Sequence, residues 1–442
     1  MKTKQSLARG TLMANVGAVA TAIRIAEQPD ARYIEQKYAQ ILNQGAEPLL
    51  PVSASLQGFS LEQIRHAHKN FSPKQFVMGG NDALIYNSYL NRFLPSSFVN
   101  PAESNHRLAR SINPLIGEVI GKNQTCSLND YVSLPESRVQ GLIIVQAGKV
   151  VFELYPGMKA AQNHVWMGLS SLAISMVFAQ FIDEGKIDID RSISVYLPEF
   201  RNTEWDRVSI RQAINGTSGL NITPTQQTMF DPNSYMSRFL AAQFGRPNAY
   251  TGYQENWLDI VKQIKRERGG EAATEQGVGP ITRAVLAYIA EEIEQLPWTQ
   301  IFENRIWGNI KAEAPMVVTL APDGTALSHD FILSSIEDAA RVAMLLCPSW
   351  PIITDTPVLP AKLTQDMRKR TGLARNSASH AFNFDKVYDD GARCLQGYFG
   401  QGMYIDTKRD YVAVYFSSQA FEPLSCPSKM MEYLRAAANQ FY

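Results

Sequence analysis

The chain has no stretch of about 20 consecutive apolar residues, which is the length that a membrane-spanning helix needs. It also has no excess of charge of either sign, because 42 lysine and arginine residues balance 42 aspartate and glutamate residues. This balance argues against nucleic acid or an anionic membrane as the main partner. Only four cysteines occur, and their scattered positions match neither a zinc site nor a disulfide framework. We therefore expect no metal site, no cofactor and no membrane span.

Motifs of several common enzyme classes are also missing. The sequence contains no H-E-x-x-H, no P-loop and no G-x-G-x-x-G. It has no G-x-S-x-G elbow either, since the glycines around Ser218 are not at the required spacing. Zinc peptidases, nucleotide-binding folds and α/β-hydrolases are therefore not indicated.

The N-terminal end has two interpretations. Lys2 and Lys4 precede a mildly apolar stretch at 12–22, but Asn15 interrupts the apolar centre that a signal peptide requires. We expect a cytoplasmic protein, with export to the periplasm or secretion as the alternative. Residues 1–130 are irregular and partly helical, which predicts an N-terminal extension before a main domain at 131–442.

Apolar runs predict strands near both ends of the main domain. The runs at 142–145 and 150–154 flank a turn at 147–149, which is typical of a β-hairpin. The runs at 402–405 and 411–416 predict a second hairpin. With helical segments between the two hairpins, we expect one sheet built from both ends of the domain.

A central helix is expected at 172–182, where almost every residue is apolar. A helix without a polar face belongs in the middle of a large core. Gly185 is well suited to end it in a left-handed conformation. The first turn, from Gly168 to Ser171, is where such a helix presents polar groups to a cleft.

Several stretches occur in the order in which one family of proteins carries them. They are the hairpin at 141–155, FIDEGKIDID at 181–190 with SVYLPEF at 194–200, IRQAINGTSGL at 210–220, VLAYIAEEIEQLPWTQIFENRIW at 285–307, SSIEDAARVAMLL at 334–346 and GYFGQGMYID at 397–406. Through these stretches the chain resembles the serine β-lactamase and penicillin-recognising superfamily. Within it, the branch of esterases and 6-aminohexanoate-dimer hydrolases looks most similar.

The resemblance covers roughly residues 138–442 and implies a fold. That fold is α/β (α+β) and β-lactamase/transpeptidase-like, with an antiparallel sheet flanked by helices and an all-helical subdomain. The sheet is expected from about 138–160 and 385–420, and the helical subdomain at about 165–330.

The resemblance also implies a reaction, because such proteins acylate a serine at the start of the central helix. Its motif is S-x-x-K, in which one helical turn places the lysine amine beside the serine oxygen. Counting back from Asp183 at the family's spacing puts the serine position at Gly168 and the lysine position at Ser171. No serine in the chain is followed by a lysine three residues later. The S-x-x-K motif is therefore missing.

The other two family motifs are missing as well. Counting back from the stretch that begins at 285 puts the tyrosine and asparagine of Y-x-N at Val278 and Pro280. Counting forward from 266–270 instead ends near Glu275, and this alignment offers no tyrosine either. The K-T-G position falls near 392–394, and no H-x-G occurs in the chain.

Three side chains are candidates for a rearranged site. Ser170 is a possible relocated nucleophile at the positive end of the helix dipole. The competing interpretation, which we favour, makes Ser170 or Ser171 an N-cap, because a serine without an adjacent base is a poor nucleophile. Glu275 is a candidate proton acceptor, against the simpler interpretation of a solvated loop carboxylate.

Two histidines lie near the expected cleft. His164, just before the central helix, can orient a serine, but a hydrogen-bonded histidine at a strand–helix junction is the simpler interpretation. His329 with Asp330 suggests an orienting pair, which we discount because adjacent residues seldom face each other.

Three hypotheses follow. The first, which we favour, is a degenerate member that binds a small molecule or a partner in the old active-site cleft, the small molecule being ester- or amide-like. The second is an active serine hydrolase, esterase, amidase or acyl transferase that uses Ser170. The third is a non-hydrolytic acid–base enzyme that uses Glu275 or a tyrosine. The oligomeric state is not indicated by the sequence.

Overall fold

The computed structural model describes residues 48–103, 106–266, 278–362, 384–422 and 428–442. Leu49 to Tyr442 form one compact unit. The part of the expected extension that follows residue 48 therefore belongs to the same unit as the main domain.

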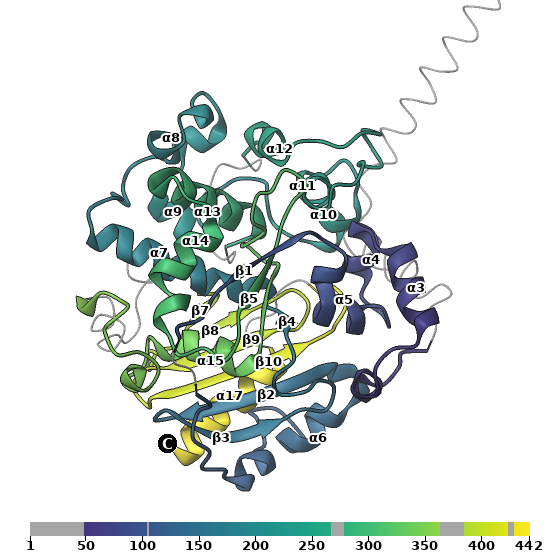
Figure 1. Cartoon of the computed structure of the whole chain (residues 1–442), viewed down its shortest axis with the longest axis vertical. Coiled ribbons are helices and arrows are strands. Elements are labelled where there is room, and N and C mark those ends of the chain that lie inside the picture. Colours follow the sequence, from purple (N-terminus) through teal and green to yellow (C-terminus); the bar gives the residue numbers. More distant parts are fainter. Residues whose placement is uncertain (1–47, 104–105, 267–277, 363–383, 423–427) are drawn as a thin grey trace, which may run out of the picture. The chain divides into compact units, whose positions relative to one another are not determined.

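A six-stranded antiparallel sheet lies in the centre of this unit (Figure 1), in the order β3-β2-β10-β9-β8-β7. The strands are β2 (Val139–Gln146), β3 (Lys149–Leu154), β7 (Lys386–Val387), β8 (Arg393–Gln396), β9 (Gly402–Asp406) and β10 (Tyr411–Ser417). Both predicted hairpins are present, as β2–β3 and β9–β10. Val412 of β10 lies opposite Val145 of β2, so the two ends of the main domain share one sheet. The predicted fold class is confirmed.

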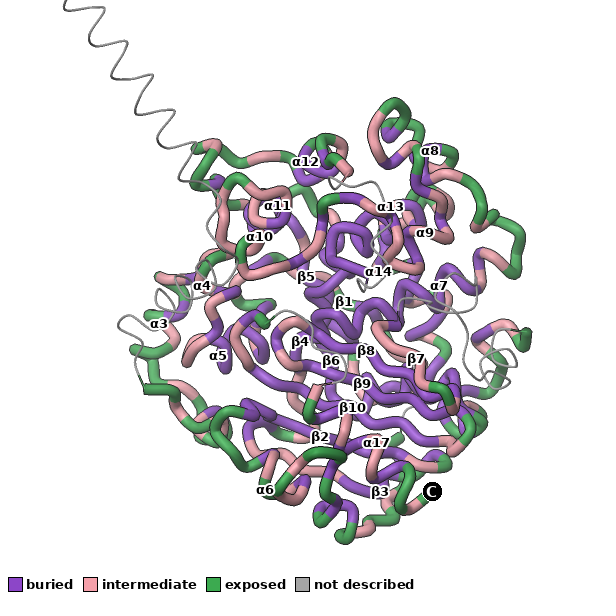
Figure 2. The backbone as a smooth tube through the Cα atoms, turned by 180° about the vertical axis from the view of Figure 1, so that it is seen from behind, coloured by how far each residue is buried: buried purple, intermediate pink, exposed green. Residues whose placement is uncertain are grey.

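Helices bury both faces of this sheet, and in Figure 2 its central strands are coloured as buried. One face packs against α7 (Ser171–Asp183) and α15 (Ile336–Met344), and the other against α6 (Leu128–Ser133) and α17 (Lys429–Phe441). Along β2, Ile143 and Val145 belong to the first core, whereas Leu142 and Ile144 belong to the second. This alternation follows from the two-residue period of a strand.

The central helix α7 is buried on nearly all sides, as its sequence predicts. Gly185 adopts φ +69° directly after it, in the left-handed region. Helices from α8 (Ile193–Tyr196) to α14 (Trp298–Arg305) form the helical part. The predicted boundary of this part at about residue 330 is too late, because strand β5 (Met316–Thr319) lies before it.

A second, smaller sheet contains β5 and was not predicted. Its order is β1-β5-β6-β4, with β1 (Ser96–Val99), β6 (Ile332–Ser334) and β4 (His164–Val165). These strands have two to four residues each, too few for an apolar period to stand out in the sequence.

The segment before the main domain contributes three helices to the same unit. They are α3 (Leu61–Asn70), α4 (Pro73–Met78) and α5 (Ala83–Tyr89). Ser60 and Gln63 form a capping box at the start of α3. Phe71, Phe76 and Tyr86 of this segment share a core with Phe331 and Phe399 of the main domain.

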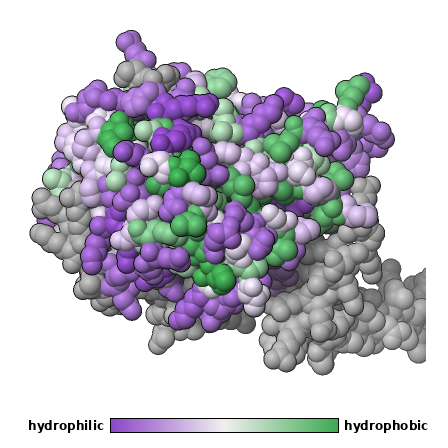
Figure 3. All heavy atoms as spheres, turned by 90° about the horizontal axis from the view of Figure 1, so that it is seen from below, coloured by the Kyte–Doolittle hydropathy of each residue, from purple (hydrophilic) through white to green (hydrophobic). Residues whose placement is uncertain are grey.

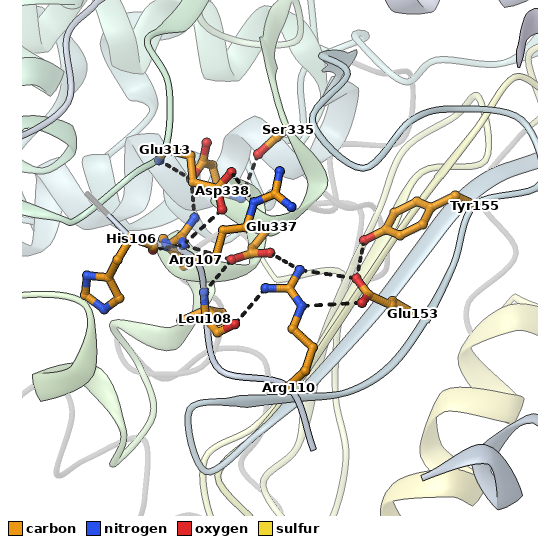
Figure 4. A network of polar contacts seen from close by, with 11 residues as sticks. His106, Arg107, Leu108, Arg110, Glu153, Tyr155, Glu313, Ser335, Glu337 and Asp338 are labelled. Atoms are coloured by element: carbon orange, nitrogen blue, oxygen red, sulfur yellow. Dashed lines mark hydrogen bonds and ion pairs between the residues drawn. The ribbon is translucent and has the colours of Figure 1, made fainter. Parts of the chain in front are cut away.

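A network of ion pairs holds the following part of the segment in place (Figure 4). Arg110 contacts Glu337 at 2.6 Å and Glu153 at 3.3 Å, so it joins α15 to strand β3. Arg341 of α15 is fully buried and contacts Glu337 and Asp338. The network therefore connects the chain around residue 110 to helix α15 and to strand β3.

No described helix is long and apolar enough to cross a membrane. On the face shown in Figure 3, hydrophobic residues are scattered among hydrophilic ones. Such isolated apolar residues are normal at a protein surface.

Candidate functional site

The start of helix α7 is fixed by backbone hydrogen bonds to the segment that follows β5. The Met167 N–H donates to the Asp330 carbonyl oxygen, and the Trp166 N–H donates to the Ile332 carbonyl oxygen, both at 2.8 Å. Met167 adopts φ +51°, which is uncommon for a residue with a side chain. Strain of this kind is often found at functional sites. The turn thus holds Gly168 in a fixed position.

No side chain fits at Gly168, the position expected for the nucleophile. A Cβ atom added there would lie 2.5 Å from the carbonyl oxygen of Gln396 and 3.2 Å from the Cα atom of Gly397. Both contacts are backbone atoms, at and just beyond the end of β8, so they cannot move aside by a rotamer change. The end of β8 therefore occupies the space in which a serine side chain would begin.

The two remaining serines of this turn are buried. The Oγ atom of Ser170 lies 2.6 Å from the Met167 carbonyl oxygen and also contacts the His329 carbonyl oxygen. Ser170 is the N-cap residue of α7, the position predicted for Ser170 or Ser171, but its side chain makes no capping hydrogen bond. Ser171 is the first residue of α7, and its carbonyl oxygen accepts a hydrogen bond from Ser175 at 2.8 Å.

The positions expected for Y-x-N lie at the start of α13 (Pro280–Glu294). Val278 is buried, and its carbonyl oxygen accepts a hydrogen bond from Arg283. Pro280 is the first residue of the helix. Glu275 lies outside the described residues.

A small cavity lies next to the motif positions, because it is lined by Pro280 and by Met167, the residue before Gly168. Its volume is about 30 Å³, which is room for about one water molecule. Its other lining residues are Phe76, Pro224, Met229, Met236, Phe239, Leu240, Gln243, His329, Asp330, Phe331, Tyr398, Phe399 and Phe421. Most of them are apolar, and Phe76 comes from the N-terminal segment. We call this space the old active-site cleft.

Two polar groups on the wall of the cleft are already paired. Arg283 forms a buried ion pair with Asp330 and also donates to the His329 carbonyl oxygen at 2.7 Å. His329 pairs with Gln243, whose Oε1 lies 2.9 Å from its Nε2. Burial, together with the Arg283 charge, lowers the pKa of His329 well below its usual value. His329 and Asp330 thus have separate partners, as expected for adjacent residues.

Two further titratable groups lie beside the end of β8 and were not found from the sequence. The Asp385 carboxyl accepts a hydrogen bond from the Gln396 N–H at 2.6 Å, and burial raises its pKa to about 7. Burial also raises the pKa of Tyr398, which keeps its hydroxyl protonated. Tyr398 lies within the stretch 397–406 that carried the resemblance, which was the only available signal.

His164 fits the simpler interpretation given above. It is fully buried, with Nδ1 2.9 Å from the Val165 carbonyl oxygen and Nε2 3.0 Å from Gln140 Oε1. Burial lowers its pKa to about 4, so it is neutral at physiological pH. It does not contact a serine through either ring nitrogen. Among the described residues, no group of three or more histidine, cysteine, aspartate or glutamate side chains is arranged to hold a metal ion.

Comparison with known proteins agrees with this architecture. Residues 136–427 match the family model described as Beta-lactamase. The chain is 20% identical over 296 residues to a 6-aminohexanoate-dimer hydrolase from Paenarthrobacter ureafaciens, covering 64% of this chain and 74% of that protein. The structure is similar to a putative 6-aminohexanoate-dimer hydrolase from Bacillus anthracis, with a TM-score of 0.68 and 16% identity, over 84% of this chain and 96% of that one.

Proposed function

Because this chain belongs to the beta-lactamase family, we propose that it is a non-hydrolytic member, which keeps the hydrolase fold without the acylation reaction. Fold alone does not transfer activity, so the proposal depends on the site itself.

One observation carries the proposal, namely the position of the Gln396 carbonyl oxygen against Gly168. A nucleophile at this position needs a Cβ atom, and the space for that atom is taken by backbone. The site is therefore unsuited to a nucleophile at this position.

Ser170 does not offer a replacement. Its hydroxyl is buried against the carbonyl oxygens of Met167 and His329. These oxygens accept a hydrogen bond from the hydroxyl, but they are not basic enough to remove its proton. A serine becomes nucleophilic only with a base beside it, and His329 directs its Nε2 to Gln243 instead. The geometry of Ser170 thus supports a structural role.

The cleft also lacks space for an ester or amide substrate. Ligand sites usually have volumes of about 300–1,000 Å³, whereas this cavity has about 30 Å³. Phe76 of the N-terminal segment lines the cavity and packs against Phe331 and Phe399, with ring centroids 5.6 and 5.5 Å apart. Any ligand of the cleft is therefore a small apolar one that displaces side chains. We place the retained role in binding, not in bond cleavage.

Covalent labelling tests the proposal. The full chain is incubated with a fluorophosphonate and, separately, with a fluorescent penicillin, and its intact mass is then measured. We expect no adduct, while an active serine esterase of the same family is labelled under the same conditions. Stoichiometric labelling of this chain would contradict the proposal.

If labelling occurs, the variant Ser170→Ala identifies its site. Loss of the adduct would support the active hydrolase with a rearranged nucleophile. An adduct that persists in this variant would exclude Ser170 and require peptide mapping of the modified residue.

A further inference from the structure

A large hollow lies beside the old active-site cleft, and Met236 lines both. The lining of the hollow is mostly polar, whereas that of the cleft is mostly apolar. It is formed by α10 (Gln226–Phe230), by α11 (Tyr235–Gln243) and by the loops before them, and its volume is about 460 Å³. Its lining residues are Asn221, Ile222, Thr223, Gln227, Thr228, Asp231, Asn233, Ser234, Tyr235, Met236 and Arg238. This volume lies within the usual range for a small-molecule site. We call it the α10–α11 hollow.

Three carboxamides of the hollow are available to a ligand. Asn221, Gln227 and Asn233 are exposed, and no described residue makes a hydrogen bond to their side-chain amides. Each carboxamide offers two donors and one acceptor oxygen. The Asp231 carboxylate accepts one hydrogen bond, from the Asn233 N–H at 2.9 Å, through its Oδ1 atom. The hollow thus presents both donors and acceptors.

The remaining polar groups form a fixed wall. Arg238 binds both oxygens of Glu255 through its Nε at 3.1 Å and also contacts Gln263 at 3.2 Å. The Tyr235 hydroxyl donates to the Gln263 carbonyl oxygen at 2.9 Å. The charge of Arg238 is therefore neutralised by Glu255. Because Asp231 adds a negative charge, the lining has no excess of positive charge. A phosphate or carboxylate ligand would find no free cation here.

Two exposed tyrosines lie on the loop that follows α11, one of the helices that form the hollow. Tyr250 and Tyr253 are 63% and 62% exposed, on the loop between α11 and α12 (Trp257–Gln263). This loop is attached to the rim, because the Asn248 side chain donates to the Pro232 carbonyl oxygen at 2.9 Å. Helices α10, α11 and α12 lie side by side in Figures 1 and 2. Exposed tyrosines present an apolar face and a polar tip to a ligand.

We propose that the α10–α11 hollow binds an uncharged polyhydroxylated ligand, namely a neutral saccharide. Each hydroxyl group of a sugar is both a donor and an acceptor, as are the free carboxamides. The C–H face of a sugar ring is apolar, and an exposed tyrosine ring offers a matching surface. The polar lining does not suit a hydrophobic ligand, because the amides would lose their hydrogen bonds to water without replacement.

Glycan binding by the full chain tests this inference. The chain is applied to a microarray of neutral and acidic glycans, and the affinity for the best neutral hit is measured by isothermal titration calorimetry. We expect binding to neutral glycans, with a loss of about two- to tenfold in Asn233→Ala and in Gln227→Ala, since each variant removes hydrogen bonds of ordinary strength. Tyr250→Ala is expected to weaken binding as well.

A matched control comes from an exposed glutamine elsewhere, Gln300 of α14, for which Gln300→Ala leaves the affinity unchanged. The absence of any neutral hit would overturn the inference, as would preferential binding of acidic glycans. Binding that the Asn233 and Gln227 variants do not affect would also overturn it. None of these outcomes bears on the acylation test, because the hollow does not include Gly168 or Ser170.

Discussion

In the turn before α7, the missing side chain of Gly168 allows the Gln396 carbonyl oxygen to lie where a Cβ atom would otherwise be. We expect Gly168→Ser to lower the free energy of unfolding by about 1–3 kcal/mol, because added atoms in a packed region force backbone shifts. The same variant should remain unlabelled by a fluorophosphonate. Urea unfolding and intact-mass measurement check the two expectations.

Gly279→Ser is the matched control for this prediction. Gly279 is the N-cap residue of α13 with φ −70°, and a Cβ atom there meets nothing closer than 3.4 Å. Serine is a favoured N-cap, so this variant should be as stable as the parent chain or slightly more stable. An equal loss of stability in both variants would contradict the steric explanation at Gly168.

The Asp385 carboxyl makes stability depend on pH. Its pKa is about 7 in the folded chain, against the ordinary value of 3.8. Between these values the folded state holds a proton that the unfolded state has lost, so this group's stabilisation is present below about pH 4 and is lost as the pH rises to about 7. Asp385→Asn should therefore gain stability relative to the parent chain as the pH rises, by about 3 kcal/mol between pH 5 and pH 8. Urea unfolding at pH 5 and pH 8 measures this.

Asp355→Asn serves as the comparison, because its side chain is 80% exposed in its ion pair with Lys311. The difference between this variant and the parent chain should stay within about 0.5 kcal/mol at both pH values. A flat difference for Asp385→Asn would show that its carboxyl does not titrate in this range.

At the scale of elements, helix α15 depends on buried charges. Arg341 is fully buried and pairs with Glu337 at 2.8 Å and with Asp338. Removing one partner of a buried pair leaves the other charge uncompensated, so Arg341→Ala should cost about 3–5 kcal/mol. Chemical unfolding of the variant measures this cost.

Arg107 belongs to the same network (Figure 4), but its side chain is 63% exposed. Arg107→Ala should cost less than about 1 kcal/mol, because water screens an exposed pair. Similar costs for the two variants would mean that burial does not control the energetics of this network.

The same elements show what the sequence predicts and what it does not. The two hairpins and α7 follow from local apolar patterns, whereas the family's spacing from Asp183 only predicts that Gly168 is the serine position. The ion pair between Arg283 and Asp330 was not predictable, because its residues are 47 positions apart in segments with no shared pattern. The contact between Gly168 and Gln396 depends on tertiary packing in the same way.

The N-terminal segment illustrates the same limit. Its composition is irregular, so the sequence predicts only an extension of unspecified purpose. The structure shows that Phe76 lines the cleft and that the Phe421 N–H donates to the Val77 carbonyl oxygen at 3.1 Å. Such contacts involve residues more than 300 positions apart, which no local pattern encodes.

At the scale of the whole molecule, one compact unit begins at Leu49. Two truncated chains test which N-terminal residues this unit needs. A chain that begins at Leu49 keeps every contact within this unit, so we expect it to unfold cooperatively on its own. A large loss of stability in this variant would mean that residues 1–48 contribute to the folded unit. Differential scanning calorimetry of the purified variant makes the measurement.

Removing residues 1–94 should have a different result. This deletion takes away α3, α4 and α5, and with them Phe71, Phe76 and Tyr86, which bury Phe331 and Phe399 of the main domain. Losing one buried aromatic side chain costs about 3–5 kcal/mol, so loss of three would cost about 9–15 kcal/mol, which is comparable with the whole stability of about 5–15 kcal/mol of a typical domain. We therefore expect this variant to be insoluble or to bind a hydrophobic dye strongly. A soluble, cooperatively folded product would instead show that the N-terminal helices are a removable cover over the old active-site cleft.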